Sequence, residues 1–193
     1  MNKTFISADF HFSHSNIILG TSLWQDKSGC RPFQTVEEHD QTILDNINSV
    51  VAENDALWIL GDFSVGSRSS GLSKEEAYIK YRNLIRCKDI KYIVGNHSLN
   101  KKRLRELGIF TEVHDYYELI YKKRLFCMSH YPFAEWNNAS HGSIMCHGHS
   151  HGNYFGRGRI IDVGVDTNSF KPYLIDDIIE LMRDVGINKI GHH

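Results

Sequence analysis

Five short motifs rich in Asp, His and Asn are the parts of this sequence best suited to chemistry. They are Asp9-Phe-His11, Gly61-Asp62, Gly95-Asn96-His97, Ser129-His130 and Gly148-His149-Ser-His151. Imidazole, carboxylate and amide groups are the ligands that bind borderline divalent metals such as Mn, Fe, Zn and Ni. Because the four cysteines include no Cys-x-x-Cys pair, we expect reduced, buried thiols and no thiolate ligand. The motifs predict a metal site.

Each motif is weak evidence when it stands alone. Asp-x-His or Gly-Asp after a strand is usually a surface turn, and a buried histidine such as His130 is more often a core residue. The segment from His147 to His151 fits a single structural metal equally well. The glycines before Asp62, Asn96 and His149 indicate tight turns or a close approach of the backbone to the site. Only the five motifs together, in this order, indicate a catalytic metal site.

Short apolar segments precede the motifs, and their nearly continuous hydrophobicity is typical of strands covered by helices. We expect strands at residues 4–8, 56–60, 90–94, 124–128, 143–146 and 159–163. Thr35 and Ser73 each begin a capping box, and the helix after Thr35 should end near Asn54. Asn100 should cap a third helix that Gly108 ends, and residues 176–185 should form a fourth.

Strands that alternate with helices predict an α/β fold. In such folds, side chains that follow the strands collect at one edge of the sheet, so the five motifs should lie together. Residues 116–165 contain several strand-like segments and no long helix, which predicts hairpins in that part of the chain.

The composition is that of an ordinary globular protein. With 193 residues we expect one domain over residues 1–190, and residues 191–193 look like the remnant of a purification tag. A net charge of −1 provides no general electrostatic attraction to nucleic acid. No segment is long and apolar enough for a membrane span or a signal peptide, so we expect a cytoplasmic protein. The sequence does not indicate an oligomeric state.

In their order, the motifs resemble those of the calcineurin-like metallophosphoesterase family, and especially its small bacterial and phage-encoded branch. The shared segments are Asp9-Phe-His-Phe-Ser-His-Ser-Asn-Ile17, Arg31-Pro-Phe33, Leu60-Gly-Asp-Phe63, Ser129-His-Tyr-Pro132 and Gly164-Val-Asp166. The resemblance implies a four-layer α/β/β/α sandwich, in which two mixed sheets are flanked by helices and the site lies at the strand ends.

The resemblance also implies a set of metal ligands. Asp9, His11 and His151 would hold one ion, Asn96, His130 and His149 would hold a second, and Asp62 would bridge the two. We expect two divalent ions, manganese first, with iron, zinc and nickel also compatible. Two such ions lower the pKa of a shared water to give a hydroxide and bind phosphate oxygens. The implied activity is hydrolysis of a phosphomonoester or phosphodiester, with a small nucleotide as the substrate.

His97 follows the ligand Asn96 and is the candidate general acid, because imidazole can transfer protons near neutral pH. The family pattern usually supplies a carboxylate partner for this histidine. Here Ser98 and Val65 occupy the two positions where that carboxylate is common. Without a group to stabilise an imidazolium, we expect better turnover of aryl phosphoesters or diesters than of alkyl monoesters, because acidic leaving groups need little protonation.

His14, Asn16 and Arg31 are candidates for contacts with the substrate phosphate, although Arg31 could equally pair with an acidic neighbour. Two alternative functions remain on the same fold: a nuclease acting on single strands, and a non-catalytic metal-binding interaction module. The second is disfavoured because every ligand position and His97 are filled. A purely structural metal is disfavoured because seven ligands exceed the need of one closed tetrahedral site.

Overall fold

The first of two β-sheets contains strands that run largely parallel. The computed structural model describes residues 2–19, 30–66 and 71–187. The first sheet has the order β4-β3-β2-β1-β9. Its strands are β1 (Thr4–Ser7), β2 (Ala56–Leu60), β3 (Asp89–Ile93), β4 (Glu112–His114) and β9 (Tyr173–Leu174). Only β9 is antiparallel to its neighbour, so the carboxyl ends of β1, β2 and β3 lie along one edge.

The second sheet begins with a hairpin and continues with parallel strands. Its order follows the chain: β5 (Tyr116–Tyr121), β6 (Arg124–Ser129), β7 (Ile144–His147) and β8 (Ile160–Asp162). The expected hairpin is present between β5 and β6, whereas β6, β7 and β8 pair in parallel. Further hairpins were therefore a wrong expectation, because the segments after β6 and β7 return along the sheet before the next strand begins. Because of this return, the residues that follow β6 and β7 lie at the same edge of the second sheet.

The helices follow the expected signals at most of their ends. They are α1 (Asn16–Leu19), α2 (Val36–Val50), α3 (Lys74–Leu84), α4 (Lys101–Leu107) and α5 (Ile175–Leu181). Thr35, Ser73 and Asn100 cap the starts of α2, α3 and α4 as predicted, and Gly108 ends α4 in the left-handed region at φ 61°.

Helix α2 ends earlier than its apolar pattern suggested. Val51 is already extended, and the carboxylate of Asp55 closes the following turn by accepting the N–H of Ala52 at 2.9 Å. Helix α5 likewise ends before residue 185, and beyond it the guanidinium of Arg159 donates to the backbone oxygens of Arg183 and Val185.

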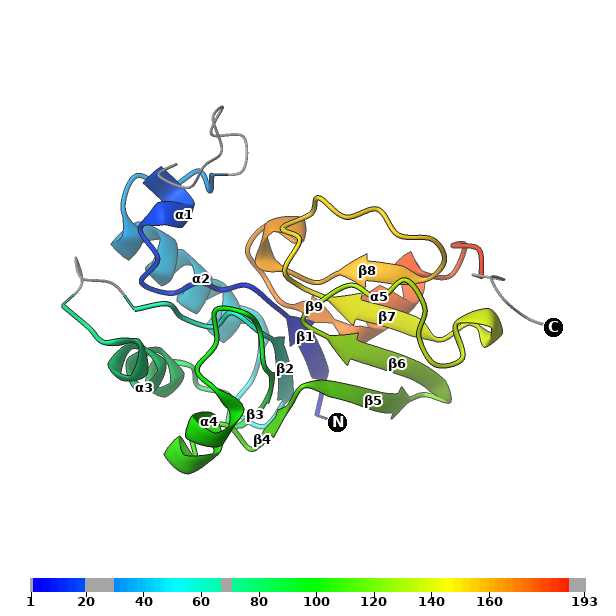
Figure 1. Cartoon of the computed structure of the whole chain (residues 1–193), viewed down its shortest axis with the longest axis horizontal. Coiled ribbons are helices and arrows are strands. Elements are labelled where there is room, and N and C mark those ends of the chain that lie inside the picture. The colour runs from blue at the N-terminus through cyan, green and yellow to red at the C-terminus, as the bar shows by residue number, and fades with distance from the viewer. Residues whose placement is uncertain (1, 20–29, 67–70, 188–193) are drawn as a thin grey trace.

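Alternating side chains of the first sheet supply two separate cores. Leu57 and Ile59 of β2 face α2, α3 and α4, while Trp58 and Leu60 face the second sheet. Figure 1 shows these three helices on one side of the first sheet and the second sheet on its other side. Helix α5 adds Ile178 to this inter-sheet core. The predicted fold, two mixed sheets with flanking helices, is confirmed.

The outer face of the second sheet is covered by the segment after β6. Trp136, which is 9% exposed, packs there against Cys127 and Met145. A short 3-10 turn, Ala139–His141, follows in the same segment.

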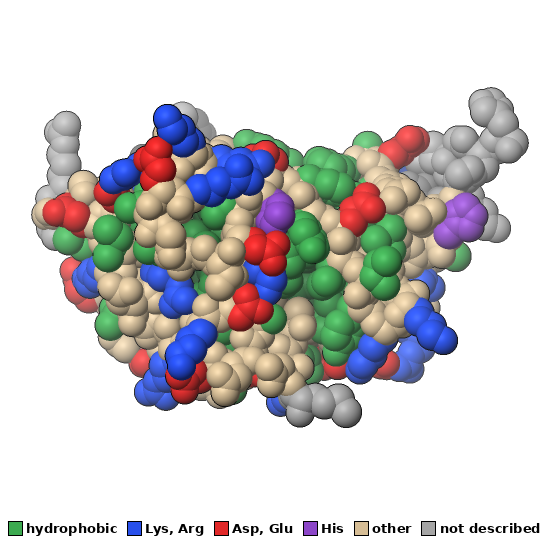
Figure 2. Space-filling view, turned by 90° about the horizontal axis from the view of Figure 1, so that it is seen from below, with side chains coloured by type: hydrophobic (Ala, Val, Ile, Leu, Met, Phe, Trp, Pro, Cys, Tyr) green, Lys and Arg blue, Asp and Glu red, His purple; other side chains and the backbone are tan. Residues whose placement is uncertain are grey.

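No helix in the described ranges is both long and apolar enough to cross a bilayer. On the face shown in Figure 2, acidic and basic side chains are interspersed.

Candidate metal centre

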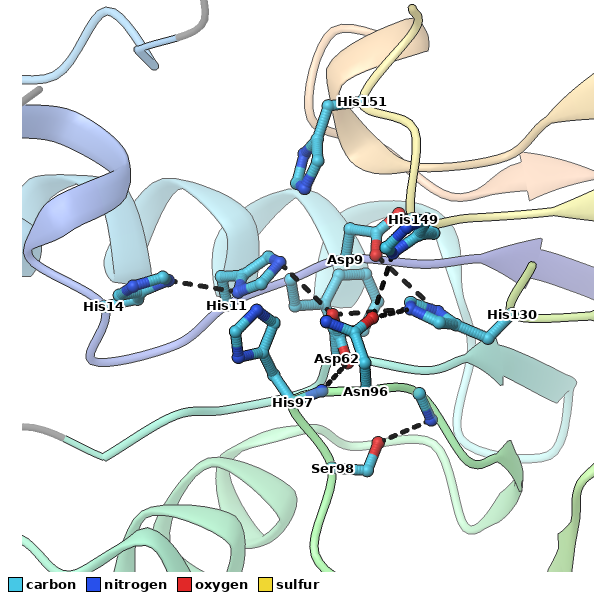
Figure 3. A network of polar contacts seen from close by, with 12 residues as sticks. Asp9, His11, His14, Asp62, Asn96, His97, Ser98, His130, His149 and His151 are labelled. Carbon is cyan, nitrogen blue, oxygen red and sulfur yellow. Dashed lines mark hydrogen bonds and ion pairs between the residues drawn. The ribbon is translucent and has the colours of Figure 1, made fainter. Parts of the chain in front are cut away.

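The seven predicted ligands come together where the strands of both sheets end (Figure 3). Asp9 and His11 follow β1, Asp62 follows β2, Asn96 follows β3, His130 follows β6, and His149 and His151 follow β7. Parallel pairing within each sheet aligns these strand ends, and packing of the two sheets on a shared core brings the two groups to one site.

Asp9, His11 and His151 form one group of donors. One ligand atom from each lies within 4.8 Å of the others, as a metal site requires. Asp9 Oδ1 and His11 Nε2 are buried and have no hydrogen-bond partner in the described parts of the chain. Nearly all buried polar atoms in proteins are paired, so two orphaned atoms on residues of one donor group indicate a missing partner. A cation bound between them would satisfy both.

Asn96, His130 and His149 form a second group beside the first. Asn96 Oδ1 lies 2.7 Å from His130 Nε2 and 2.9 Å from His149 Nδ1. His130 is oriented by its other nitrogen, which donates to the backbone oxygen of Leu60 at 2.8 Å. Its Nε2 atom therefore carries no proton, and its lone pair can bind a metal ion.

Asp62 lies between the two groups. Its Oδ2 atom is 3.5 Å from His130 Nε2 and 3.7 Å from His11 Nε2. Asp62 also joins Asp9 and His130 in a further set of close donor atoms. Its other oxygen, Oδ1, accepts the backbone N–H of His97 at 2.8 Å.

The electrostatics of the donors also fit a cation. Burial raises the pKa of Asp9 well above its usual value, and the nearby carboxylates of Asp62, Asp162 and Asp166 raise it further. Burial lowers the pKa of His11, so its ring is neutral and able to bind metal. A bound divalent cation would favour both the charged carboxylate and the neutral imidazole.

Five of the seven predicted ligands have a left-handed backbone. Their φ angles are 58° at Asp9, 51° at His11, 51° at Asp62, 68° at His149 and 47° at His151. This conformation is uncommon for residues other than glycine and costs roughly 1–3 kcal/mol at each position. Backbone hydrogen bonds between the loops hold it, including His11 N–H to the Asp62 oxygen at 2.9 Å. Such strain is typical of functional sites.

The glycines beside the ligands leave no room for a side chain, as predicted from the sequence. A Cβ atom on Gly95 would lie 2.3 Å from Asp62 Oδ1, and one on Gly148 would lie 2.6 Å from Asp9 Oδ2. Any side chain at these positions would therefore displace a carboxylate of the site.

His97 projects into solvent beside the donors. Its ring centroid is 5.6 Å from that of His11, and no hydrogen bond to its ring is found among the described residues. Ser98 does not replace the missing carboxylate, because its Oγ accepts the N–H of Gly95 at 2.7 Å and bonds the hydroxyl of Tyr92 at 2.6 Å. Ser98 thus supports the turn that carries Asn96 and His97.

Of the three predicted phosphate contacts, Arg31 instead pairs with an acidic residue, which was the alternative considered for it. Its side chain is buried and pairs with both carboxylate oxygens of Asp166 at 2.8 Å. His14 Nδ1 lies 3.1 Å from His11 Nδ1, and burial lowers the pKa of His14 to about 4. His14 is therefore neutral at physiological pH. Asn16 is exposed at the first position of α1.

Asp166 is the residue that sequence reasoning missed. Its Oδ2 atom lies 2.8 Å from His151 Nδ1, so it contacts a predicted ligand directly. The Gly164-Val-Asp166 segment already stood out as a shared motif, and that was the available signal. Its partner could not be inferred, because Arg31 lies 135 residues away in the sequence.

Comparison with known proteins identifies the family of this chain. The family model described as calcineurin-like phosphoesterase matches residues 3–189. An uncharacterised protein of Methanocaldococcus jannaschii is 30% identical over 192 residues, which cover 95% of this chain and 93% of that protein. The gene 66 protein of Mycobacterium phage L5 is 26% identical over 176 residues, covering 78% of each chain.

A solved structure of a protein of unknown function from Aquifex aeolicus shares the fold, with a TM-score of 0.69 and 24% identity over 94% of this chain and 100% of that chain. The family match extends over nearly the whole sequence, from residue 3 to residue 189. This chain therefore belongs to the calcineurin-like phosphoesterase family, whose members are metal-dependent hydrolases of phosphoester bonds.

Proposed function

We propose that this protein hydrolyses phosphomonoesters or phosphodiesters of small nucleotides with two divalent metal ions. Manganese is the ion we expect first, because the donors are imidazole, carboxylate and amide oxygen, with iron, zinc and nickel also compatible. One ion would be held by Asp9, His11 and His151, the other by Asn96, His130 and His149, and Asp62 would contact both.

The pair of orphaned buried atoms, Asp9 Oδ1 and His11 Nε2, carries this proposal. Both atoms can bind a cation through a lone pair, and both residues belong to the close group that includes His151. The convergence of His130 and His149 on the side-chain oxygen of Asn96 supports a second ion.

When bound, two such ions supply an activated water and neutralise charge on the phosphoryl oxygens. The residues of the chain then position the substrate and move protons. We expect His97 to give a proton to the leaving oxygen, and two observations support this role: its backbone N–H is anchored on Asp62, and its exposed ring lies 5.6 Å from that of His11. His14 is neutral, so its free Nε2–H can donate a hydrogen bond to a phosphate oxygen if His11 Nδ1–H donates to His14 Nδ1.

Tyr131 supports a nucleotide or aryl substrate. Its side chain is 46% exposed, and its ring centroid is 4.7 Å from that of His149. An exposed aromatic ring at the edge of a phosphate site offers a stacking surface for a base, and such stacking contributes about 1–3 kcal/mol per base.

Metal analysis combined with a diesterase assay tests the proposal. We expect two equivalents of Mn²⁺ to bind and bis-4-nitrophenyl phosphate to be hydrolysed in their presence. Asp62→Asn should abolish that activity, because Asp62 lies between both donor groups. Asp55→Asn is the matched control, since Asp55 is also a buried carboxylate, and within the described residues its side chain binds only the N–H groups of Lys3 and Ala52.

Protein that binds no divalent metal would end the proposal. A panel of mononucleotides, cyclic nucleotides and phosphosugars then tests the substrate class. A phosphosugar that is turned over better than every nucleotide would reject the nucleotide assignment while leaving the phosphoesterase assignment in place.

A further inference from the structure

A hydrogen-bonded series of buried and half-buried polar side chains leads from helix α2 to the ring of His151. Asp40 Oδ1 lies 2.8 Å from His39 Nδ1, and His39 Nε2 lies 2.8 Å from Arg31 Nη1. The guanidinium of Arg31 pairs with both oxygens of Asp166, and Asp166 Oδ2 lies 2.8 Å from His151 Nδ1. These hydrogen bonds therefore connect a helix on the outer side of the first sheet with His151, a predicted ligand that follows a strand of the second sheet.

The hydrogen bonds of Arg31 account for all five of its N–H groups. Two go to Asp166 and one to His39 Nε2, which makes His39 the neutral tautomer protonated at Nδ1. The other two go to the backbone oxygens of Asp9 at 2.6 Å and Phe10 at 3.0 Å. No donor remains for a substrate phosphate. The same side chain instead fixes the left-handed turn at Asp9, which carries a predicted ligand.

The carboxylate of Asp166 determines which nitrogen of His151 faces the donor group. A carboxylate can only accept, so His151 Nδ1 carries the proton and Nε2 keeps its lone pair. Hydrogen bonds of this kind fix the tautomer and the ring orientation of metal-binding histidines, and their loss typically weakens metal binding 10- to 100-fold.

We propose that Asp166 and Arg31 are positioning residues for the site formed by Asp9, His11 and His151. Asp166 selects the tautomer and orientation of the His151 ring. Arg31 holds Asp166 in place through a planar two-bond pair and ties it to the backbone of Asp9. This inference rests on the proposed metal-dependent function, and its tests separate the two.

The first test measures the tautomer of His151 in the metal-free wild-type protein. Nitrogen-15 NMR of the imidazole at about pH 9, where histidine is neutral, distinguishes the two tautomers. We expect His151 to be protonated at Nδ1, and we expect Asp166→Asn to raise the population protonated at Nε2. A wild-type His151 protonated at Nε2 would overturn the inference, whether or not the protein binds metal.

The second test is a titration of metal-free protein with Mn²⁺. Calorimetry and electron paramagnetic resonance measure the binding during the titration. Asp166→Asn should raise the dissociation constant of one of the two Mn²⁺ sites by 10-fold or more. The dissociation constant of the other site should change by less than about threefold. Arg31→Lys keeps the charge but loses the planar fork, so it should weaken the same site by a smaller factor. Asp55→Asn, the matched buried carboxylate, should bind Mn²⁺ as the wild type does.

The two proposals fail in different ways. Wild-type protein without metal binding refutes the proposed function. Wild-type protein that binds two ions, together with Asp166→Asn that binds both equally well, refutes the positioning role alone. If Asp166→Asn does not fold, the tautomer in the wild-type protein still decides the question.

Discussion

Gly95→Ala should separate the geometry of the site from the stability of the fold. A Cβ atom at this position would lie 2.3 Å from Asp62 Oδ1, 2.9 Å from Asp62 N and 2.9 Å from His130 Cε1. Ordinary contact begins at 3.4 Å, so the Asp62 carboxylate must move by about 1 Å. Backbone and a buried ring close the other sides, which leaves the carboxylate as the group that moves.

The size of this shift sets the expected loss of activity. A displacement of about 1 Å in a catalytic group can lower a rate roughly 10²-fold. Asp62 lies between the two donor groups and also anchors the backbone of His97, so the shift affects both metal binding and proton transfer. We therefore expect kcat/KM to fall by about 100-fold. Crowding of this kind should lower the free energy of unfolding by about 1–3 kcal/mol.

Gly186→Ala is the matched control, because a Cβ atom there meets nothing within 4 Å. Both variants would be assayed with bis-4-nitrophenyl phosphate at saturating Mn²⁺, and their unfolding would be followed by urea titration. Gly186→Ala should retain wild-type activity. If Gly95→Ala stays within threefold of Gly186→Ala in kcat/KM, the close packing described around Asp62 is not functionally important.

Three further variants probe proton transfer, burial and pH. His97→Ala should lower kcat for an alkyl phosphoester by about 10²–10⁴-fold and for the 4-nitrophenyl ester far less, whereas equal losses would remove His97 from leaving-group protonation. Arg31→Met should lower the free energy of unfolding by about 3–5 kcal/mol in urea, because it removes the buried guanidinium partner of the Asp166 carboxylate, which then keeps, among the described residues, only its bond to His151. Arg103→Met breaks an exposed ion pair and should change the free energy of unfolding little, and similar losses in the two variants would contradict this. Burial lowers the pKa of His39 from 6.5, so the unfolded chain takes up a proton that the folded chain resists, and stability falls as the pH drops below 6.5. The wild-type advantage over His39→Gln should therefore shrink from about pH 7 to about pH 5 in urea titrations, and a constant difference would disprove it.

Features encoded within a few residues could be predicted from the sequence. Thr35, Ser73 and Asn100 cap helices because each side chain bonds a backbone N–H three residues later. The strand ends were equally readable, since continuous apolar segments stop where the Asp and His motifs begin. Parallel pairing then brought those motifs together.

Features that depend on distant partners could not be predicted. The role of Arg31 is set by Asp166, which lies 135 residues along the chain. Parallel pairing of β6 with β7 was hidden for a similar reason, because it depends on the path of the intervening segment. The left-handed conformations at Asp9 and His11 carry no glycine to mark them. They arise from backbone hydrogen bonds between separate loops.

The division of the donor atoms between the two sheets has a consequence for folding. Asp9, His11, Asp62 and Asn96 follow strands of the first sheet, whereas His130, His149 and His151 follow strands of the second. Neither sheet alone carries a complete predicted donor group, so binding of a metal ion at either proposed site would require the two sheets to be docked. A bound ion would link the two sheets, and its rate of release would then report how often they separate.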